Sequence, residues 1–322
     1  LMCEALGQRC ASAAMVFAMH QVQVGCVVHH GHSAWFNAYA RRLVAGQRLI
    51  ASVTSEAGVG GSVRTSICAI EPDASGADAS FRVHKDGTVV SYADAADDLL
   101  MTVRRDSDAA ASDQALVMVD KGQCQLQRTS TWDAMGMRGT CSPGFKIKAR
   151  GEPWQVLSTS FADISAESMV PYSHVLWAAL WSGIAHQALQ RAATYVRAVA
   201  RKQPGQTPHT AHMLAKAVAE LQTLRQIWQD TAHKFEQDAE NRCALHSMPW
   251  SLRFNNLKVQ AAEQAPKLVH QALQIVGIQG YKNDGPYAMG RAYRDVLSAS
   301  LMIANERILS KSADMLLILK DF

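Results

Sequence analysis

The sequence predicts an α+β multidomain fold, in which N-terminal helices are followed by an antiparallel β-barrel and then by a four-helix bundle. Three observations predict this order. Apolar residues step by three and four near both ends of the chain. Short β-rich runs fill the middle, and Gly and Asp turns separate them without an intervening long helical pattern. We therefore expect a partial helical domain over 1–50, a β-barrel domain over 51–163 and a helical bundle over 164–322.

Composition limits the class of protein. The chain has 322 residues, of which 48% are hydrophobic and 19% charged, so it can bury a sizeable core. The net charge of +4 comes without a basic run, so we expect no nucleic acid partner. We also expect no membrane association, because no uninterrupted apolar stretch reaches spanning length. Seven Cys without a C-x-x-C pair predict reduced core thiols and a cytoplasmic location. The abrupt helical start suggests that further residues precede Leu1.

The expected strands are seven β-rich runs of the middle segment. They cover 49–56, 64–71, 81–92, 98–105, 115–122, 145–151 and 154–161. The expected bundle helices follow. Two helices lie on either side of "RKQPGQTP" at 201–208, and two more cover about 253–276 and 288–319. Helices of this length that pack antiparallel form a bundle.

Two loops of the middle segment carry chemistry-bearing residues. "TSEAGVGGSVRTS" at 54–66 gathers glycines and hydroxyls, which let backbone N–H groups and side chains approach a ligand. It matches neither a P-loop nor G-x-G-x-x-G, so an ordinary β-turn remains the alternative. Ser91 ends a strand in "VVSYADAAD", and Arg138 lies in the Gly-rich "MGMRGTCS". Each of these two residues could equally belong to a simple turn.

Histidines give weaker signals. The spacing of "HHGH" at 29–32 fits no zinc pattern, so we expect solvated or helix-capping histidines and no metal. His20 lies in an apolar helix and His174 at a helix start. Each is either a core histidine with satisfied hydrogen bonds or a histidine of a ligand pocket.

Six motifs in this order resemble those of the acyl-CoA dehydrogenase superfamily of flavoproteins, over essentially the whole chain. They are "SEAGVGGS", "VVSYADAAD", "DAMGMRGTCS", "RKQPG", "ALQIVGIQGY" and "RAYRD". The resemblance implies FAD held between barrel and bundle, and a homodimer or homotetramer. It implies an enzyme that desaturates an acyl thioester carried by CoA or a carrier protein. An electron-transfer flavoprotein or a flavin reductase would be its redox partner.

The resemblance also assigns residues to the cofactor and the substrate. The implied flavin-binding residues are Ser55, Glu56, Gly58, Gly60 and Ser91 near the ring, Arg201 at the phosphates, and Gln274 and Gly277 from a neighbouring subunit. Hydroxyls and backbone N–H groups stabilise a reduced flavin ring, and Arg pairs with phosphate. Ser62 and Arg138 are the implied substrate contacts.

The chain departs from the family at the catalytic base. The usual glutamate lies eight residues after the Arg-Asp pair, and that position here is Ile303, which cannot take a proton. One reading keeps the dehydrogenase and gives the proton to His174 or another group. The alternative is the superfamily's monooxygenase branch, similar to dibenzothiophene monooxygenase, in which His20 and Ser91 take the matching positions. A flavin-poor, non-catalytic relative is the third reading. In each case we expect Arg294 and Asp295 to anchor the start of the last helix.

Overall fold

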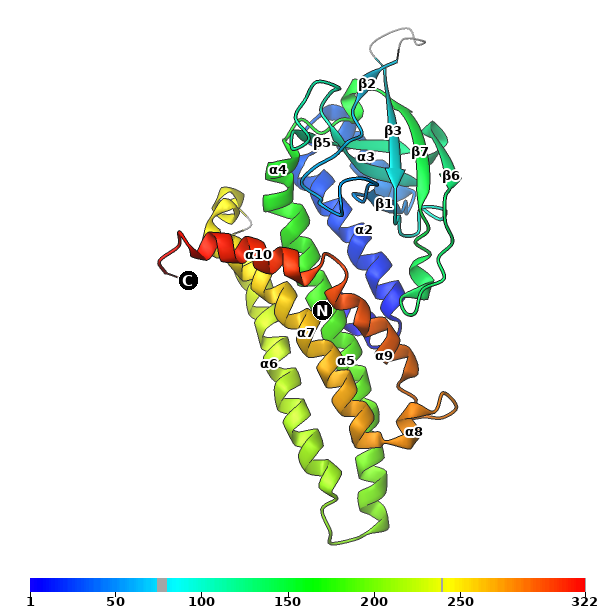
Figure 1. The fold of residues 1–322 in the computed structure, drawn as a ribbon, viewed down its shortest axis with the longest axis vertical. Helices are drawn as coiled ribbons and strands as arrows, with labels where there is room; N and C mark the ends of the chain where they lie inside the picture. Colours follow the sequence, from blue (N-terminus) through cyan, green and yellow to red (C-terminus); the bar gives the residue numbers. More distant parts are fainter. Residues whose placement is uncertain (74–79, 239, 322) are drawn as a thin grey trace. The chain divides into compact units, whose positions relative to one another are not determined.

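Helices begin and end the chain and strands occupy its middle, in a computed structural model that describes residues 1–73, 80–238 and 240–321. Two compact units share these elements. Unit 1 contains residues 1–18, 134–139 and 173–322, and unit 2 contains 19–133 and 140–172. Figure 1 traces the chain from the N-terminal helices through the strands to the long helices.

The N-terminal helices are α1 (Met2–Gly7), α2 (Ala11–His30) and α3 (Ala34–Ala45). α3 begins directly after Ser33, because the Ser33 side chain accepts a hydrogen bond from the Phe36 N–H and caps the helix. Contrary to our expectation, α2 is long and apolar enough to cross a membrane. Its most apolar stretch is 56% buried inside the protein, as in the core helix of a soluble domain.

Unit 2 contains two sheets. The first has the order β1 (Ile50–Val53), β4 (Asp98–Arg104), β5 (Gln114–Asp120). The second has the order β2 (Glu71–Pro72), β3 (Phe81–Gly87), β7 (Phe145–Gly151), β6 (Cys124–Arg128). Alternate residues of β3 and β7 are buried, which gives this sheet one apolar and one polar face. Within the described ranges the ladders form two separate sheets, and a closed barrel is not observed.

The strand predictions need four corrections. β1 pairs with β4 in parallel, not antiparallel. The run 154–161 begins in the short 3₁₀ helix Pro153–Gln155 and makes only an isolated bridge at Val156. The run 64–71 yields only Glu71, the first residue of β2, and a bridge at Ala69. We missed β6, because this strand is mostly exposed and its polar side chains hide the alternation.

The core of unit 2 joins the first sheet to the helices around it. Twelve buried residues form this cluster: Cys26, Val27, Phe36, Tyr39, Leu43, Ile50, Leu100, Leu116, Met118, Leu157, Phe161 and Ile164. Contacts from α2 and α3 on one side and β1, β4 and β5 on the other fix the position of the strand ends. The loop that carries Ser55 follows β1, and the turn that carries Ser91 leads into β4.

Two of the three HHGH histidines belong to this packing, whereas His32 is exposed, as we predicted. His30 is 3% exposed, and its Nε2 lies 2.9 Å from the Ser168 hydroxyl. His29 stacks on Tyr172, with Nε2 2.9 Å from the phenol oxygen. Ser168 lies in the π-helix Ser165–Met169, which follows α4 (Phe161–Ile164). The prediction of solvated or capping histidines is therefore wrong for His30.

Unit 1 is dominated by three long helices, which Figure 1 shows side by side. They are α5 (Val170–Lys202), α6 (His209–Gln237) and α7 (Met248–Val276). Each presents its apolar positions to the others, and α7 buries thirteen residues along its length. The expected bundle is present, although α7 begins five residues before the predicted start.

The fourth bundle helix is broken, so the prediction of one helix over 288–319 is wrong. The segment contains α9 (Gly290–Val296), the 3₁₀ turn Leu297–Ser300 and α10 (Asn305–Leu316), after the short α8 (Ile278–Tyr281). Ile303 has a φ of 53°, a left-handed conformation that a β-branched residue rarely adopts and that a helix cannot contain. The break thus falls at the position where the resemblance would place the catalytic glutamate.

The seven cysteines are all free, and not all of them are core residues. Cys3, Cys26 and Cys68 are buried, and burial raises the pKa of the Cys3 thiol to about 11. Cys10, Cys141 and Cys243 are exposed, which corrects the prediction that all seven are core thiols.

Candidate functional site

The Gly-rich loop of unit 2 follows β1 and is held from below by Glu56. This carboxylate is 5% exposed and accepts hydrogen bonds from the Ser66 hydroxyl at 2.6 Å and the Cys68 N–H at 2.6 Å. Lys85 Nζ lies 2.9 Å away, and its side chain is fully buried. Burial raises the pKa of Glu56, but these hydrogen bonds outweigh it, and the net pKa lies below its ordinary value. Glu56 therefore holds the loop in shape, and its side chain makes internal contacts instead of the predicted flavin contact.

The glycines of the same loop adopt a left-handed backbone. Gly58, Gly60 and Gly61 have φ values of 87°, 58° and 78°, which side-chain-bearing residues avoid. A Cβ on Gly60 would meet nothing within 4 Å. Ser62 lies at the end of this turn, where its hydroxyl accepts from the Arg64 N–H at 3.3 Å. The loop presents backbone and small side chains to its surroundings.

Ser55 joins this loop to the strand end that carries Ser91. Its hydroxyl donates to the Val89 carbonyl at 2.7 Å and accepts from the Val89 N–H at 3.2 Å. Ser91 lies two residues further on and is half-buried. The structure therefore brings two of the predicted ring contacts, Ser55 and Ser91, into one corner of unit 2.

A second loop adds hydroxyls to this corner. Ser142 Oγ donates to Ser91 Oγ at 2.9 Å, and Thr140 Oγ1 lies 2.8 Å from Ser142 Oγ. The Tyr92 N–H donates to the Thr140 carbonyl at 2.9 Å and the Cys141 carbonyl at 3.1 Å. Both Tyr92 and Cys141 have positive φ, 45° and 43°. Strained residues of this kind gather where the surrounding structure fixes a functional geometry.

His20 lies on α2 and is oriented by the backbone of β1. Its Nδ1 accepts a hydrogen bond from the Ile50 N–H at 3.1 Å, which places the ring proton on Nε2. Burial lowers the pKa of His20, although the Ile50 hydrogen bond opposes this. The Ile50 carbonyl in turn accepts from the Tyr92 hydroxyl at 3.0 Å. The backbone of one residue, Ile50, thus links His20 to Tyr92 beside Ser91.

His174 is a core histidine of unit 1. Its Nδ1 lies 3.0 Å from the Phe254 carbonyl, its side chain is 3% exposed, and burial lowers its pKa to about 4. Trp177 packs against its ring at a centroid distance of 6.2 Å. A base of this strength is poorly matched to abstracting a proton near neutral pH.

The turn at Ile303 in unit 1 is held by a lysine. Lys258 on α7 is 0% exposed, and its Nζ donates to the Ile303 carbonyl at 2.6 Å and to Asn305 Oδ1 at 2.7 Å. Its ammonium also lies 5.8 Å from the centre of the Trp181 ring. Burial lowers the pKa of Lys258 to about 8. A buried cation thus lies next to the position where the family would place an anionic base.

The other predicted residues of unit 1 lie on exposed ends and loops. Arg201 is in the last turn of α5, and Gln274 and Gly277 are at the end of α7, all exposed. The two helices run in the same direction, so these residues lie toward one end of the unit (Figure 1). Gly277 has a φ of 67° and caps α7. Arg138 is exposed in the short segment 134–139.

Asp295 anchors that segment from near the end of α9, and not at the start of a helix as we predicted for the Arg-Asp pair. It is 8% exposed, and its Oδ1 accepts from the Met137 N–H at 2.7 Å. A Cβ on Gly136 would collide with the Arg294 carbonyl, so only glycine allows this approach. The anchor is therefore the hydrogen bond that the Asp295 carboxylate accepts from a loop N–H.

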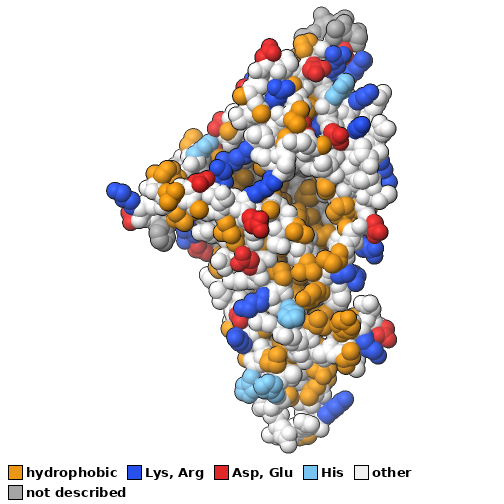
Figure 2. Space-filling model, in the orientation of Figure 1, with side chains coloured by type: hydrophobic (Ala, Val, Ile, Leu, Met, Phe, Trp, Pro, Cys, Tyr) orange, Lys and Arg blue, Asp and Glu red, His pale blue; other side chains and the backbone are white. Residues whose placement is uncertain are grey.

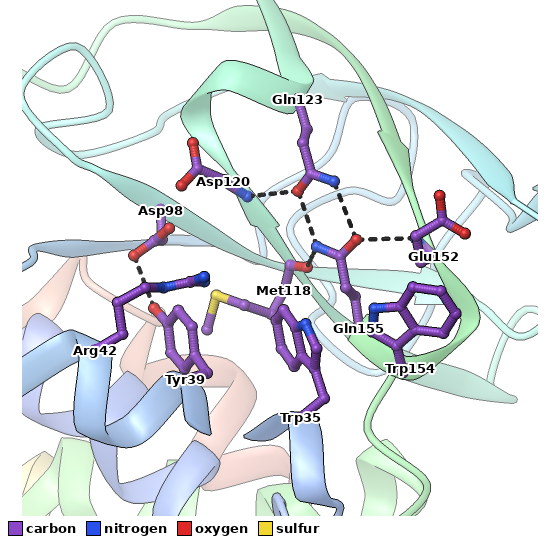
Figure 3. A pocket seen from close by; sticks show the side chains of 10 residues that line it. All are labelled: Trp35, Tyr39, Arg42, Asp98, Met118, Asp120, Gln123, Glu152, Trp154 and Gln155. Carbon is purple, nitrogen blue, oxygen red and sulfur yellow. Dashed lines mark hydrogen bonds between the residues drawn. The ribbon is translucent and has the colours of Figure 1, made fainter. Parts of the chain in front are cut away.

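Two cavities of unit 2 lie apart from the hydroxyl corner. The first, of about 240 Å³, is lined by ten residues, and none of them is a predicted site residue. Figure 3 shows that its polar groups bond to one another: Gln123 and Gln155 exchange hydrogen bonds, and Tyr39 donates to Asp98. Glu56 is the one predicted residue that lines the second, of about 330 Å³. Neither cavity is our candidate site.

The sequence did not reveal four residues of these arrangements: Tyr92, Ser142, Lys85 and Lys258. Tyr92 and Ser142 belong to the motifs "VVSYADAAD" and "MGMRGTCS", so their proximity to Ser91 was available from the motifs as a hypothesis. Lys85 and Lys258 give no local signal. Each looks like an ordinary charged residue in a strand or helix, and only the fold shows that it is buried.

Comparisons with known proteins agree with the fold. Residues 165–303 match the family model "Acyl-CoA dehydrogenase, C-terminal domain". An amino sugar nitrososynthase of Streptomyces peucetius is 26% identical over 235 residues, which are 70% of this chain and only 56% of that protein. The mitochondrial isovaleryl-CoA dehydrogenase of Arabidopsis thaliana is 23% identical over 310 residues, 91% of this chain and 69% of that protein. The FMN-bound dibenzothiophene monooxygenase TdsC of Paenibacillus sp. A11-2 superimposes with a TM-score of 0.79 at 17% identity, covering 98% of this chain and 82% of that one.

Helices, two sheets with serine-bearing loops and a bundle of long helices give the fold of the acyl-CoA dehydrogenases. Residues 165–303 match the C-terminal domain model of that family, and isovaleryl-CoA dehydrogenase is similar to this chain over 91% of its length. The residues present fit a flavin ring. Ser55 and Ser91 share one corner with buried Thr140 and Ser142, and the glycines beside them allow close approach.

Proposed function

We propose that the protein is a reduced-flavin-dependent monooxygenase that oxidises a nitrogen or sulfur atom of a small organic substrate. One observation carries the choice of reaction. At the position of the usual catalytic glutamate the chain has Ile303, in a left-handed turn whose carbonyl is bound by Lys258. A hydrocarbon side chain beside a buried ammonium cannot act as a base.

Neither His174 nor Glu306 is a suitable base for the α-proton of an acyl thioester. His174 is neutral and buried, with a pKa of about 4. Glu306 begins α10 and is exposed. Desaturation of an acyl thioester requires removal of the α-proton, and the described parts of unit 1 offer no carboxylate at the expected place. The oxygenase reaction needs no such base at Ile303.

The residues of unit 2 suit the oxygenase reaction. Bound reduced flavin supplies two electrons with which O₂ is activated, so that one oxygen atom enters the substrate and the other leaves as water. His20 carries its proton on Nε2 because Nδ1 is occupied by the Ile50 N–H. It can therefore donate that proton or a hydrogen bond where negative charge develops on oxygen. Ser91 would bond the ring through its hydroxyl proton, whereas Ser55, whose proton goes to the Val89 carbonyl, would offer only its remaining lone pair.

The relatives support the substrate class. One acts on amino sugars and is named a nitrososynthase, and the structural neighbour TdsC is named a dibenzothiophene monooxygenase. Oxidation at nitrogen or sulfur is common to both names. The second candidate is acyl thioester dehydrogenation with FAD, favoured by the match to isovaleryl-CoA dehydrogenase over 91% of the chain. In that reaction the base would come from outside the Ile303 turn.

The test begins with flavin binding. We expect the purified chain to quench the fluorescence of FMN or FAD on titration. Arg201→Ala should weaken FAD but not FMN binding if Arg201 reaches the adenine-side phosphate. A chain that takes up neither flavin contradicts both enzymatic functions.

The second step separates the two reactions. With a flavin reductase, NADH and ¹⁸O₂, we expect one ¹⁸O atom in a product from a panel of amines, amino sugars and thiophenes. His20→Ala should reduce this turnover by about 10²-fold or more while flavin stays bound. The exposed His212→Ala is the matched control and should leave turnover unchanged. Anaerobic bleaching of the flavin by acyl-CoA without a reductase would instead establish the dehydrogenase.

A further inference from the structure

The hydroxyls of Thr140, Ser142 and Ser91 form a row in unit 2. Thr140 Oγ1 and Ser142 Oγ are 2.8 Å apart, and Ser142 Oγ donates to Ser91 Oγ at 2.9 Å. Thr140 and Ser142 are 4% and 2% exposed, whereas Ser91 is half-buried. The row therefore begins in the protein interior and ends at the residue that reaches the flavin corner.

Counting protons gives the row a direction. Each hydroxyl has one proton to donate and can accept two hydrogen bonds. Ser142 Oγ has two acceptors within reach, Ser91 Oγ at 2.9 Å and the Thr140 carbonyl at 3.3 Å, and Ser91 Oγ is the nearer of the two. When Ser142 donates to Ser91, a lone pair of Ser91 is occupied and the Ser91 proton remains for another acceptor. Hydrogen bonds in such a chain polarise one another, which strengthens the last donor.

The backbone fixes the row in place. The Val90 N–H donates to the Pro143 carbonyl at 3.0 Å, and the Tyr92 N–H is shared between the Thr140 and Cys141 carbonyls. These bonds lie on both sides of the Ser91–Ser142 pair in sequence. The positive φ of Tyr92 and of Cys141 is maintained by them. The two loops are consequently held in register without any ligand.

We propose that Ser142 is a positioning residue of the flavin site, whose hydroxyl turns the Ser91 proton toward the bound flavin ring. This inference rests on the flavin-dependent function proposed above. Ser91 is the group that touches the flavin, and Ser142 acts through it. The ligand atom that accepts from Ser91 is a ring nitrogen or carbonyl oxygen, since the flavin edge offers acceptors of both kinds.

The experiment is a double-mutant cycle on flavin binding, read by fluorescence and by the absorbance bands of the bound flavin. Ser91→Ala and Ser142→Ala should each weaken binding about threefold to tenfold, the range expected for one oriented hydrogen bond. The double variant should bind no more weakly than Ser91→Ala, because Ser142 acts through Ser91. Both single variants should shift the flavin absorbance bands in the same direction.

Three further variants keep the test decisive. Ser142→Thr retains the hydroxyl and should restore affinity and absorbance toward those of the unaltered protein. Ser142→Cys keeps the volume with a weak donor, so it should resemble Ser142→Ala and replaces it if the alanine variant is unfolded. Ser130→Ala is the matched control, because Ser130 is exposed and binds only the Gly144 N–H at 2.8 Å.

Two results would overturn the inference while leaving the proposed function intact. One is a double variant in which the two losses of affinity multiply. The other is a Ser142→Ala protein with unaltered affinity and absorbance. If the unaltered chain binds neither FMN nor FAD, the proposed function and this inference both fail.

Discussion

Lys258 offers the most quantitative test of the structure, because it is a fully buried ammonium without a carboxylate among its contacts. Burial lowers its pKa from 10.5 to about 8 in the folded protein. This difference in pKa corresponds to roughly 3 kcal/mol of folding free energy, since each pKa unit is worth about 1.4 kcal/mol. Lys258→Met removes the charge and keeps most of the volume.

The sign of the effect follows from proton linkage. Below pH 8 both the folded and unfolded chains carry the proton, and the folded state bears the full cost of the buried charge. Between pH 8 and 10.5 the unfolded chain binds more protons, so stability rises with pH. We expect the unfolding free energy of the unaltered protein, relative to that of Lys258→Met, to rise by up to about 3 kcal/mol across this window.

The assay is urea unfolding at pH 7, 8, 9 and 10, with the difference between the two proteins taken at each pH. Groups that titrate in both proteins cancel in this difference. Lys216→Met, at an exposed position on α6, is the matched control and should give a pH-independent difference. A flat difference for Lys258→Met as well would refute a buried Lys258, and with it the account of the Ile303 turn.

Three other predictions test different parts of the fold. Glu56→Gln should destabilise the protein by about 3–5 kcal/mol in urea unfolding, because Lys85 would stay buried without its charge partner; a loss below about 1 kcal/mol would contradict the buried ion pair. Gly136→Ala should cost about 1–3 kcal/mol, since its Cβ would collide with the Arg294 carbonyl, and an unchanged thermal midpoint would argue against that contact. Large apolar side chains of α8 and α10 are exposed, and orange patches mark such residues in Figure 2. We propose that they support a homodimer or homotetramer, so Leu317→Glu, at a position 87% exposed, should lower the mass measured by light scattering, and an unchanged mass would remove Leu317 from the interface.

The order of the elements could be predicted because it depends on local periodicity. β3 and β7 bury every second residue, and the three long helices bury residues at steps of three and four. β6 was missed because an exposed edge strand needs no such alternation. The break at Ile303 was missed for a different reason. Its cause is Lys258, which lies 45 residues earlier in the chain and leaves no trace in the local pattern.

The candidate site was predictable only in part. The glycines 58, 60 and 61 have positive φ values, and a hydrogen bond from Ser55 to Val89 brings Ser55 near Ser91, but the flavin contacts of both serines stay predictions. The role of Glu56 could not be predicted, because its partner Lys85 lies 29 residues away on another strand. The flavin contacts of Arg201, Gln274 and Gly277, and the substrate contacts of Ser62 and Arg138, stay predictions.

The bond between Asp295 and Met137 has a consequence for any attempt to divide the chain. Met137 lies in a six-residue segment, 134–139, that belongs to unit 1 although the residues on both sides of it belong to unit 2. A fragment limited to the family match, 165–303, would retain the Asp295 carboxylate but lack the N–H that it binds. Such a fragment would leave a buried carboxylate without its hydrogen bond donor, which costs stability.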